Sequence, residues 1–400
     1  MNESLSPRVD FPLLDDVTYL NTASMGLVPV PVQEQAAAFD RELALRGTTW
    51  FDEEQETFAL ERARSAAARL LNAGPDSMAI ATSMTEALSQ IAWWLRPGQG
   101  TNIVSIDLEF PSVVYPWYRV AAETGAEVRL VQVRDDPAAL SLERLAELVD
   151  NRTAVICVSH VQFATGFRFA LDDLGKLARA HDAVLVVDAT QSAGMVPIDL
   201  QATPVDLVLA GGYKWLGAAF GAAIAYLGPA ILERIEPPFV GWRSTVDPYA
   251  LDVTAMPLAP SARRLEFSTM SYSAGVALGA AIEYVLDLGI PRIFDHDLAL
   301  ATRLMEGLDR VGATLLTPHG AESRGGIVTA RFPGRDGEEV AAHLNEAGVI
   351  VSPRFGSTRF STHHFNRASD VDQALDVLEG VRRAVAQLEA GCAEMENAYP

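Results

Sequence analysis

The sequence predicts an α/β fold, in which helices cover both faces of a mainly parallel sheet, followed by a smaller α+β C-terminal domain. Strand and helix patterns alternate from residue 75 to residue 230, and the runs 184–187 and 205–210 are almost continuously apolar. Such runs are typical of strands buried on both faces of a parallel sheet. Beyond about Tyr272 the helices become longer. This change of texture indicates a second domain.

The elements follow in order from local patterns. Residues 80–81 form an apolar strand, and the capping-box spacing of Ser83 and Glu86 opens a helix over 85–94. Residues 171–181 have the apolar period of an amphipathic helix. The other apolar runs predict strands at 103–106, 127–133, 154–158, 184–187 and 205–210, with helices at 111–124 and around 142–148 between them.

The uncharged stretch 215–232 has nearly the length of a membrane span. It consists mostly of Ala and Gly, contains Pro229, and is divided into turn-sized pieces by Gly217, Gly221 and Gly228. We therefore predict a turn, a strand over 221–226 and a second turn, and no association with a membrane.

The C-terminal region predicts helices at 274–286, 296–311 and 371–388, and strands at 327–331 and near 349–352. We expect a large domain over residues 26–272 and a small domain made of residues 1–25 and 273–400. No repeat or low-complexity tract interrupts them.

Composition excludes several classes of protein. An apolar content of 49% rules out a disordered chain. Lys+Arg 31 against Asp+Glu 52 gives a net charge of −21, so a nucleic-acid surface would have to work against the overall field. The two cysteines, Cys157 and Cys392, have neither disulfide-framework nor metal spacing, and residues 1–16 carry no secretory signal. We expect a cytoplasmic protein.

Two weaker patterns add little. The adjacent His363 and His364 would point to opposite faces of an extended segment, so we expect no metal site there. His160, which follows the strand 154–158, is interpreted as a residue behind the site. No G-x-G-x-x-G, Walker A or G-x-S-x-G pattern is present, which removes the usual signatures of a nicotinamide-dependent oxidoreductase, a P-loop protein and a serine hydrolase.

Lysine is rare in this chain, which has only Lys176 and Lys214. Lys176 lies in the amphipathic helix 171–181, where a solvated charge is expected. Lys214 follows the buried strand 205–210 and a Gly-Gly pair, and precedes Trp215. A buried lysine can supply a neutral amine, which arginine cannot. The alternative is an aliphatic stem lying along apolar surface with its ammonium in water.

Asp188 closes the buried strand 184–187, and Gln191 follows three residues later. A carboxylate in this position needs a cationic partner, and the pyridinium nitrogen of pyridoxal phosphate is such a partner. Alone, Asp188 would be interpreted as a cap of the next segment. Together with a lysine at the end of the next strand, which could bind the aldehyde, it predicts a pyridoxal-phosphate site.

The remaining groups of such a site have candidates. Free N–H groups at the start of the helix 85–94 could hold a phosphate, with Tyr213 as a second donor. Phe110, at the mouth of a strand, could stack on a flat ring, although a phenylalanine there is more often core. Arg354 and Arg359 flank residues 355–358, and a bidentate arginine is the usual holder of an amino-acid carboxylate.

With these motifs, 187–194 (VDATQSAG) and 212–216 (GYKWL), the chain resembles fold-type I pyridoxal-phosphate enzymes of the class V aminotransferase family. The resemblance extends from Tyr19-Leu20-Asn21-Thr22-Ala23 to Phe365-Asn366. It implies pyridoxal 5′-phosphate as cofactor and Lys214 as the Schiff-base lysine. It further implies Asp188 at the pyridine nitrogen, Gln191 at the ring phenolate, Phe110 on the ring, and Met84, Thr85 and Tyr213 at the phosphate.

The resemblance also implies a homodimer whose site is shared between subunits. Residues 266–269, with Thr269, resemble the stretch that reaches into the neighbouring site, and Trp242 is a further candidate. Asn21, Arg354 and Arg359 would contact the amino-acid substrate.

Departures from the family pattern narrow the expected reaction. Cysteine desulfurases accept sulfur on a loop cysteine and usually stack histidine on the ring, whereas residues 352–359 contain no cysteine and the ring position is Phe110. Phe163 stands where desulfurases carry asparagine. We therefore expect no persulfide chemistry. β-Elimination, as in C–S lyases, ranks first, and transamination, epimerisation and decarboxylation stay open. The non-enzymatic alternative is a catalytically silent family member, against which the intact Asp188, Gln191 and Lys214 argue.

Overall fold

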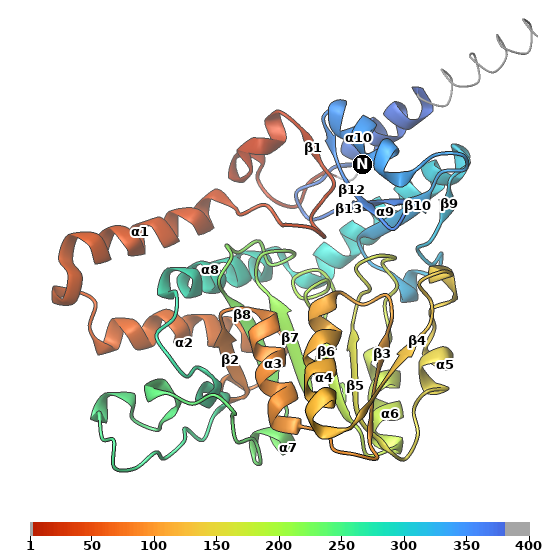
Figure 1. Cartoon of the computed structure of the whole chain (residues 1–400). Coiled ribbons are helices and arrows are strands. Elements are labelled where there is room, and N and C mark those ends of the chain that lie inside the picture. Colours follow the sequence, from red (N-terminus) through yellow and green to blue (C-terminus); the bar gives the residue numbers. More distant parts are fainter. Residues whose placement is uncertain (1–2, 381–400) are drawn as a thin grey trace, which may run out of the picture.

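The computed structural model describes residues 3–380, and a seven-stranded sheet lies at its centre (Figure 1). Four neighbouring pairs are parallel, and only β8 runs against its two neighbours. The α/β class is therefore confirmed. In spatial order the strands are β2 (Met78–Ala81), β8 (Ala223–Leu227), β7 (Leu207–Gly211), β6 (Val184–Asp188), β5 (Thr153–Ser159), β3 (Asn102–Ile106) and β4 (Glu127–Val131).

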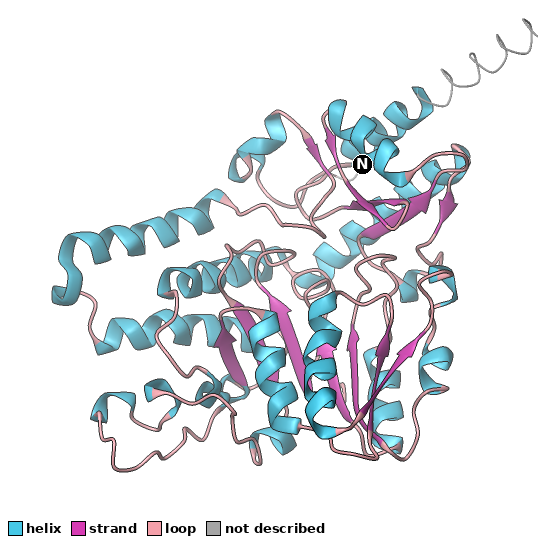
Figure 2. Cartoon of the chain, viewed as in Figure 1, coloured by secondary structure: helices cyan, strands magenta, loops and turns pink. Residues whose placement is uncertain are grey.

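Each central strand is apolar on both faces because helices cover both. In β7, Val208 and Ala210 belong to one buried cluster, and Leu207 and Leu209 to the other. Figure 2 shows the two helical layers around the sheet. One layer contains α3 (Met84–Leu95), α4 (Pro111–Thr124) and α7 (Pro229–Leu232); the other contains α1 (Val30–Arg46), α2 (Glu53–Leu70), α5 (Leu142–Ala146), α6 (Leu171–Ala180) and α8 (Tyr272–Leu288).

A smaller antiparallel sheet lies above the carboxyl edge of the large one (Figure 1). It packs on α9, α10 and the helical residues 368–380 through a separate apolar cluster. The N-terminal β1 (Thr18–Tyr19) pairs in parallel with β11 (Val349–Ile350), so the N-terminal segment is joined to the C-terminal region. The other elements are α9 (Ile290–Arg310), β9 (Thr314–Leu315), β10 (Ile327–Arg331), α10 (Gly337–Glu346), β12 (Ser352–Arg354) and β13 (Ser357–Ser361). The division at residues 25/26 and 272/273 stays a proposal.

Several predicted boundaries shift by a few residues. The strand expected near 349–352 is two short strands, β11 and β12, because they pair with different partners. The helix expected at 296–311 begins at Ile290, where Pro291 is favoured in a first turn. The expected helix 371–388 begins by residue 368, and its second half lies outside the described residues.

Among residues 3–380, no single helix is long and apolar enough to cross a membrane. The adjacent helices α8 and α9 satisfy the length and composition test only as a pair, which is bent by 75°.

The sheet brings several polar side chains to one edge. Because β2, β7, β6, β5 and β3 run in the same direction, the loops that follow them meet at their carboxyl ends. Ser83, Glu109, Ser159, Asp188 and Lys214 lie in or just before these loops. Ligands of open α/β sheets bind at this edge.

A buried ion pair fixes the segment that precedes Thr269. Arg64 of α2 donates from Nη1 to both carboxylate oxygens of Glu266, at 2.8 and 2.6 Å. One of these oxygens also accepts from the backbone N–H of Ile80, at 2.9 Å. Both charged side chains are buried. Loss of Arg64 would leave the Glu266 carboxylate without a cation inside the protein, whereas Arg64 also pairs with Glu61, at 2.7 Å.

We expect Arg64→Ala to lower the free energy of unfolding by about 3–5 kcal/mol, because Glu266 would stay buried without a cation. Urea unfolding at matched cofactor content measures this change. The control is Arg46→Ala, which removes the exposed pair between Arg46 and Glu42 and should cost less than about 1 kcal/mol. Equal losses in the two variants would contradict the structural role of the buried pair.

Candidate active site

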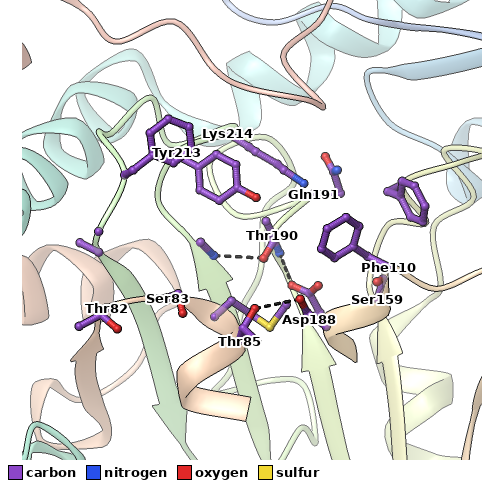
Figure 3. A pocket seen from close by; sticks show the side chains of 17 residues that line it. Thr82, Ser83, Thr85, Phe110, Ser159, Asp188, Thr190, Gln191, Tyr213 and Lys214 are labelled. Carbon is purple, nitrogen blue, oxygen red and sulfur yellow. Dashed lines mark hydrogen bonds between the residues drawn. The ribbon is translucent and has the colours of Figure 1, made fainter. Parts of the chain in front are cut away.

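A cavity of about 180 Å³ opens at the carboxyl edge of the large sheet. Figure 3 shows Lys214 and Tyr213 on one side of it, Asp188 and Thr190 on its floor, and Phe110 opposite. The predicted residues Met84, Thr85, Phe110, Asp188, Gln191, Tyr213 and Lys214 all line it. The fold therefore brings these seven residues, which are far apart in the sequence, together around one cavity.

Lys214 is 8% exposed. Its Nζ lies 5.6 Å from the centre of the Phe110 ring and 5.5 Å from that of Tyr213. Burial lowers the pKa of Lys214 to about 8; the charge of Asp188 opposes this shift, and those of Arg359 and Arg354 add to it. At pH 7 about a tenth of this amine is therefore unprotonated, far more than of an exposed lysine.

The N-terminal segment holds the loop that carries this lysine. The backbone N–H of Gly26 donates to the carbonyl of Tyr213 at 2.9 Å. A side chain at position 26 would collide with the carbonyl group of Lys214, so only glycine permits this approach. On the other side, Gly194, at φ +95°, leaves room for the Trp215 carbonyl.

Asp188 is buried at the end of β6. Its Oδ1 accepts from the backbone N–H of Thr190 at 2.8 Å, and the Thr190 hydroxyl accepts from the Gly211 N–H at 3.1 Å. Burial raises the pKa of Asp188, while the hydrogen bonds from Thr190 and the charge of Lys214 act in the opposite direction. The carboxylate thus lies in a place where a cation close to it would be strongly favoured.

Glu109 is a second buried acid at this edge. Ser159 donates to it from its backbone N–H at 2.8 Å and from its hydroxyl at 2.5 Å. Burial raises the pKa of Glu109 to about 7; the hydrogen bonds from Ser159 oppose this shift, and the charge of Asp188 contributes to it. The two acids therefore share one buried neighbourhood.

The start of α3 has the features of an anion site. Ser83 caps the helix by accepting from the Glu86 N–H at 3.1 Å, as expected from the capping-box spacing. Glu86 accepts from the N–H of Thr82 at 2.8 Å rather than from that of Ser83, so the Ser83 N–H stays available at the start of the helix. The hydroxyl of Thr85 donates to Ser112 at 2.9 Å.

Three aromatic rings form a wall from the cavity outward. The ring of Phe110 meets that of Phe163 edge to face at 5.7 Å, and Phe163 meets Phe355 at 6.2 Å. Phe110 is 43% exposed, so it is not a core residue. This exposure favours stacking of Phe110 on a flat ligand ring over a role in the hydrophobic core.

Both the oxygen and the nitrogen of the Gln191 side-chain amide form a hydrogen bond. Its Oε1 accepts from the indole N–H of Trp215 at 2.7 Å, and its Nε2 donates to the carbonyl of Ala23 at 3.0 Å. Because an amide nitrogen carries two hydrogens, one N–H is left for a ligand.

Arg354 and Arg359 meet at one hydroxyl group. Both donate to Oγ of Ser24, at 3.1 and 2.6 Å. Ser24 in turn contacts Ser352 at 2.9 Å, and the Ser352 hydroxyl donates to Asn21 at 2.8 Å. Asn21 and the two arginines therefore form one polar network with Ser24, next to the lysine whose pKa the arginines lower.

Trp242 and Thr269 lie apart from this cavity within one chain. Trp242 lines a separate hollow with residues 245–257, and its ring meets Tyr249 at 5.7 Å. Thr269 is exposed in the loop before α8.

The structure tests the predicted orientation of His363 and His364 and the predicted place of His160 behind the site. The rings of His363 and His364 are 4.2 Å apart, so the expectation that they point to opposite faces is wrong, because a turn begins here instead of an extended segment. Both ring nitrogens of His363 are engaged, with Asp297 at 3.0 Å and the Trp215 carbonyl at 2.9 Å. His160 is buried, and its backbone N–H donates to the Asp188 carbonyl at 2.9 Å.

Sequence reasoning missed Ser24, Glu109 as a buried acid, and Phe220, whose ring lies 4.9 Å from that of Tyr213. Ser24 follows directly on the 19–23 motif, and Glu109 directly precedes Phe110. Their position next to a recognised motif is the only feature of the sequence that could have indicated a role for Ser24 and Glu109.

The donor set fits pyridoxal phosphate. Asp188 is a buried acid, and a cation such as a protonated pyridine nitrogen would compensate its charge. The start of α3 has N–H groups that could bind a phosphate. Lys214 provides an amine, part of which is unprotonated, that could bind an aldehyde. The Arg359 Nε has no acceptor although the side chain is 1% exposed, as expected beside a site for an anionic ligand.

Comparisons with known proteins agree with this chemistry. The family described as Aminotransferase class-V matches residues 18–373. The chain is 32% identical to the isopenicillin N epimerase of Streptomyces clavuligerus, over 92% of the chain and 96% of the relative. It is 27% identical to a probable cysteine desulfurase of Pyrococcus abyssi, over 93% and 96%.

Solved structures have the same fold. The apo cysteine desulfurase of Thermococcus onnurineus superimposes with a TM-score of 0.84 at 25% identity, covering 94% of this chain and 97% of the other. The cystine C–S lyase C-DES superimposes with a TM-score of 0.84 at 23% identity, covering 92% and 98%. With the family match and the site geometry, these results establish that the chain belongs to the class-V aminotransferase family, as a fold-type I enzyme that depends on pyridoxal 5′-phosphate.

Proposed function

We propose that the enzyme acts on an amino acid, that Lys214 moves its Cα proton, and that the reaction is a β-elimination of the C–S lyase type. The observation that carries the proposal is the shared burial of Lys214 and Asp188 in one cavity, beside an arginine pair that forms no ion pair with any acid of residues 3–380. These groups are the base, the ring partner and the carboxylate holder that such a reaction requires.

The other residues take the roles that the family resemblance implies. When bound, pyridoxal phosphate supplies an aldehyde and a cationic ring that accepts an electron pair from the substrate. Asp188 would hold the proton at the pyridine nitrogen, and Phe110 would pack on the ring. Gln191 donates its free N–H to the phenolate. Met84, Thr85 and Tyr213 bind the phosphate at the start of α3.

Arg359 holds the α-carboxylate of the substrate. Its guanidinium is almost fully buried and donates to the carbonyl of Phe163 at 2.9 Å and to Ser24 at 2.6 Å. Asn21 contributes indirectly, because it accepts from Ser352 and so orients Ser24. A carboxylate placed here would fix the Cα–H bond relative to Lys214.

Elimination ranks above persulfide formation for a structural reason. Within residues 3–380 the only cysteine is Cys157, which is buried in β5. Burial raises the pKa of its thiol, which keeps it protonated and unreactive. Elimination needs a leaving group on the substrate and no protein nucleophile.

Epimerisation is the second candidate, because the relative with 32% identity is named isopenicillin N epimerase. It would require a proton donor on the face opposite Lys214. Phe110 occupies the wall across the cavity from the lysine, and its side chain cannot donate a proton (Figure 3). Transamination would need only Lys214 to move the proton between two carbon atoms, so it shares the same base.

A homodimer completes the proposed site. In a second copy of the chain, Trp242 and the exposed Thr269 would be free to approach the phosphate end of the cavity. This proposal rests on the family resemblance. The cytoplasmic location stays a prediction from cysteine usage.

Borohydride treatment of the holoenzyme should leave a pyridoxyl adduct on Lys214, because reduction traps a cofactor bound to an amine. Peptide mass mapping identifies the residue. Lys214→Ala should give no adduct, whereas Lys176→Ala, in the exposed pair with Asp173, should retain it. An adduct on Lys176, or none with cofactor supplied, would refute the assignment and favour a silent family member.

The rate of cofactor uptake should follow the neutral fraction of Lys214. Because its pKa is lowered to about 8, the rate should rise roughly tenfold per pH unit below pH 8 and level off above it. Stopped-flow absorbance of cofactor-free protein mixed with pyridoxal phosphate measures this profile. Arg359→Gln should move the inflection to higher pH, because it removes a nearby positive charge. A rate that still rises steeply at pH 9.5 would contradict the assigned environment.

The reaction class is tested by product analysis. β-Elimination converts a cysteine S-conjugate and water into pyruvate, ammonia and the free thiol. We expect the three products in equal amounts from the wild-type holoenzyme and none from Lys214→Ala. A D-amino acid without pyruvate would instead support epimerisation, and a keto acid that retains the thioether would support transamination.

A further inference from the structure

Two guanidinium groups meet at Ser24 with no acid between them. Apart from Ser24, Arg359 donates to the Phe163 carbonyl, and Arg354 to the Pro353 carbonyl at 2.6 Å. Within residues 3–380, neither forms an ion pair. Of the other buried arginines, Arg64 and Arg243 each bind a glutamate, whereas Arg324 donates to the His319 carbonyl and the Thr302 hydroxyl.

Placing two cations side by side in a partly buried network is unfavourable without an anion. The shared Ser24 hydroxyl accepts from both, so it offers hydrogen bonds and no charge compensation. Burial and the adjacent Arg354 lower the pKa of Arg359 to about 9. One substrate carboxylate compensates one guanidinium in a bidentate contact. The second guanidinium still lacks a partner.

The two arginines lie at different depths. Arg359 is inside β13, paired with Ser352 of β12, and is 1% exposed. Arg354 pairs with Ser357 as the last residue before the turn of the β12–β13 hairpin, and it is only half-buried. Arg354 is therefore the outer of the two.

The hairpin turn itself has an unusual residue. Phe355 has φ +48°, a left-handed conformation that disfavours a bulky side chain. Its ring is 45% exposed and contacts Phe163 on one side, while the Arg134 guanidinium lies 5.0 Å from its centre on another. Arg134 forms no ion pair within the described part of the chain. Strain of this kind persists where the surroundings require it, often at ligand sites.

We infer that the substrate is an amino acid with a second carboxylate, which Arg354 binds while Arg359 binds the α-carboxylate. The rings of Phe163 and Phe355 contact the carbon chain between the two acidic groups, and Arg134 adds positive charge at the entrance. The inference rests on the proposed function, because it names the substrate class of the same site. It holds for either candidate reaction.

The test uses binding, so it is independent of the reaction. The holoenzyme is titrated with glutamate and glutamine, and with aspartate and asparagine, and the absorbance of its bound cofactor reports occupancy. Each pair differs in charge at nearly constant shape. We expect the acidic member of at least one pair to bind about 10- to 100-fold more tightly, as for one charge-assisted bidentate contact.

Arg354→Gln should remove most of this preference and leave the affinity for the neutral member within about threefold, since the α-carboxylate contact stays intact. Arg354→Lys should restore part of it, because it restores the charge without the planar fork. The matched control is Arg331→Gln, whose guanidinium contacts the same hairpin at Ser357, at 3.3 Å, away from Ser24. It should keep the full preference.

Equal binding of acidic and neutral amino acids by the wild type would overturn the inference and leave the proposed function standing. A preference that survives in Arg354→Gln would overturn the role of Arg354. If no amino acid changes the spectrum of a holoenzyme that carries its adduct on Lys214, both the proposed function and the inference fail.

Discussion

The desolvation of charge at the carboxyl edge of the large sheet is the constraint on which the site depends. Asp188, Glu109, Lys214 and Arg359 are all buried there, and burial is the largest cause of each pKa shift. In water these groups would be ordinary acids and bases. Inside the protein, each acquires a strong preference for a partner of opposite charge, and that preference is the source of both specificity and reactivity.

The fold produces this burial by bringing distant segments over one edge. Asp188 ends strand β6 of the large sheet, and Lys214 follows the neighbouring parallel strand β7. The N-terminal segment, joined to the small domain through β1 and β11, delivers Ser24 and closes over Lys214 at Gly26. The β12–β13 hairpin brings both arginines from above. The polar network between Asn21, Ser352 and Ser24 therefore links the positions of the arginines to that of the lysine.

The sequence predicts the parts of this arrangement that arise from local patterns. Asp188, Phe110, Lys214 and the start of α3 each follow a buried apolar strand, and parallel strands bring their ends together. Ser24 carries no such signal, because its role depends on contacts more than 300 residues away in the chain. The histidine prediction was wrong because an extended backbone was assumed where a turn begins. The periodic pattern of apolar residues predicts helices and strands, but it predicts neither long-range contacts nor local turns.

The geometry of the arginine pair bears directly on the choice of reaction. A substrate held by one carboxylate can rotate about the bond to its α-carbon, whereas one held at two carboxylates by Arg359 and Arg354 cannot turn freely. The Cα–H bond then has one orientation relative to Lys214, while the wall across the cavity presents Phe110, which cannot donate a proton. Two-point binding thus favours reactions in which a single base removes the proton and the electron pair leaves toward Cβ. The features behind the proposed substrate class thereby also support the proposed elimination over epimerisation.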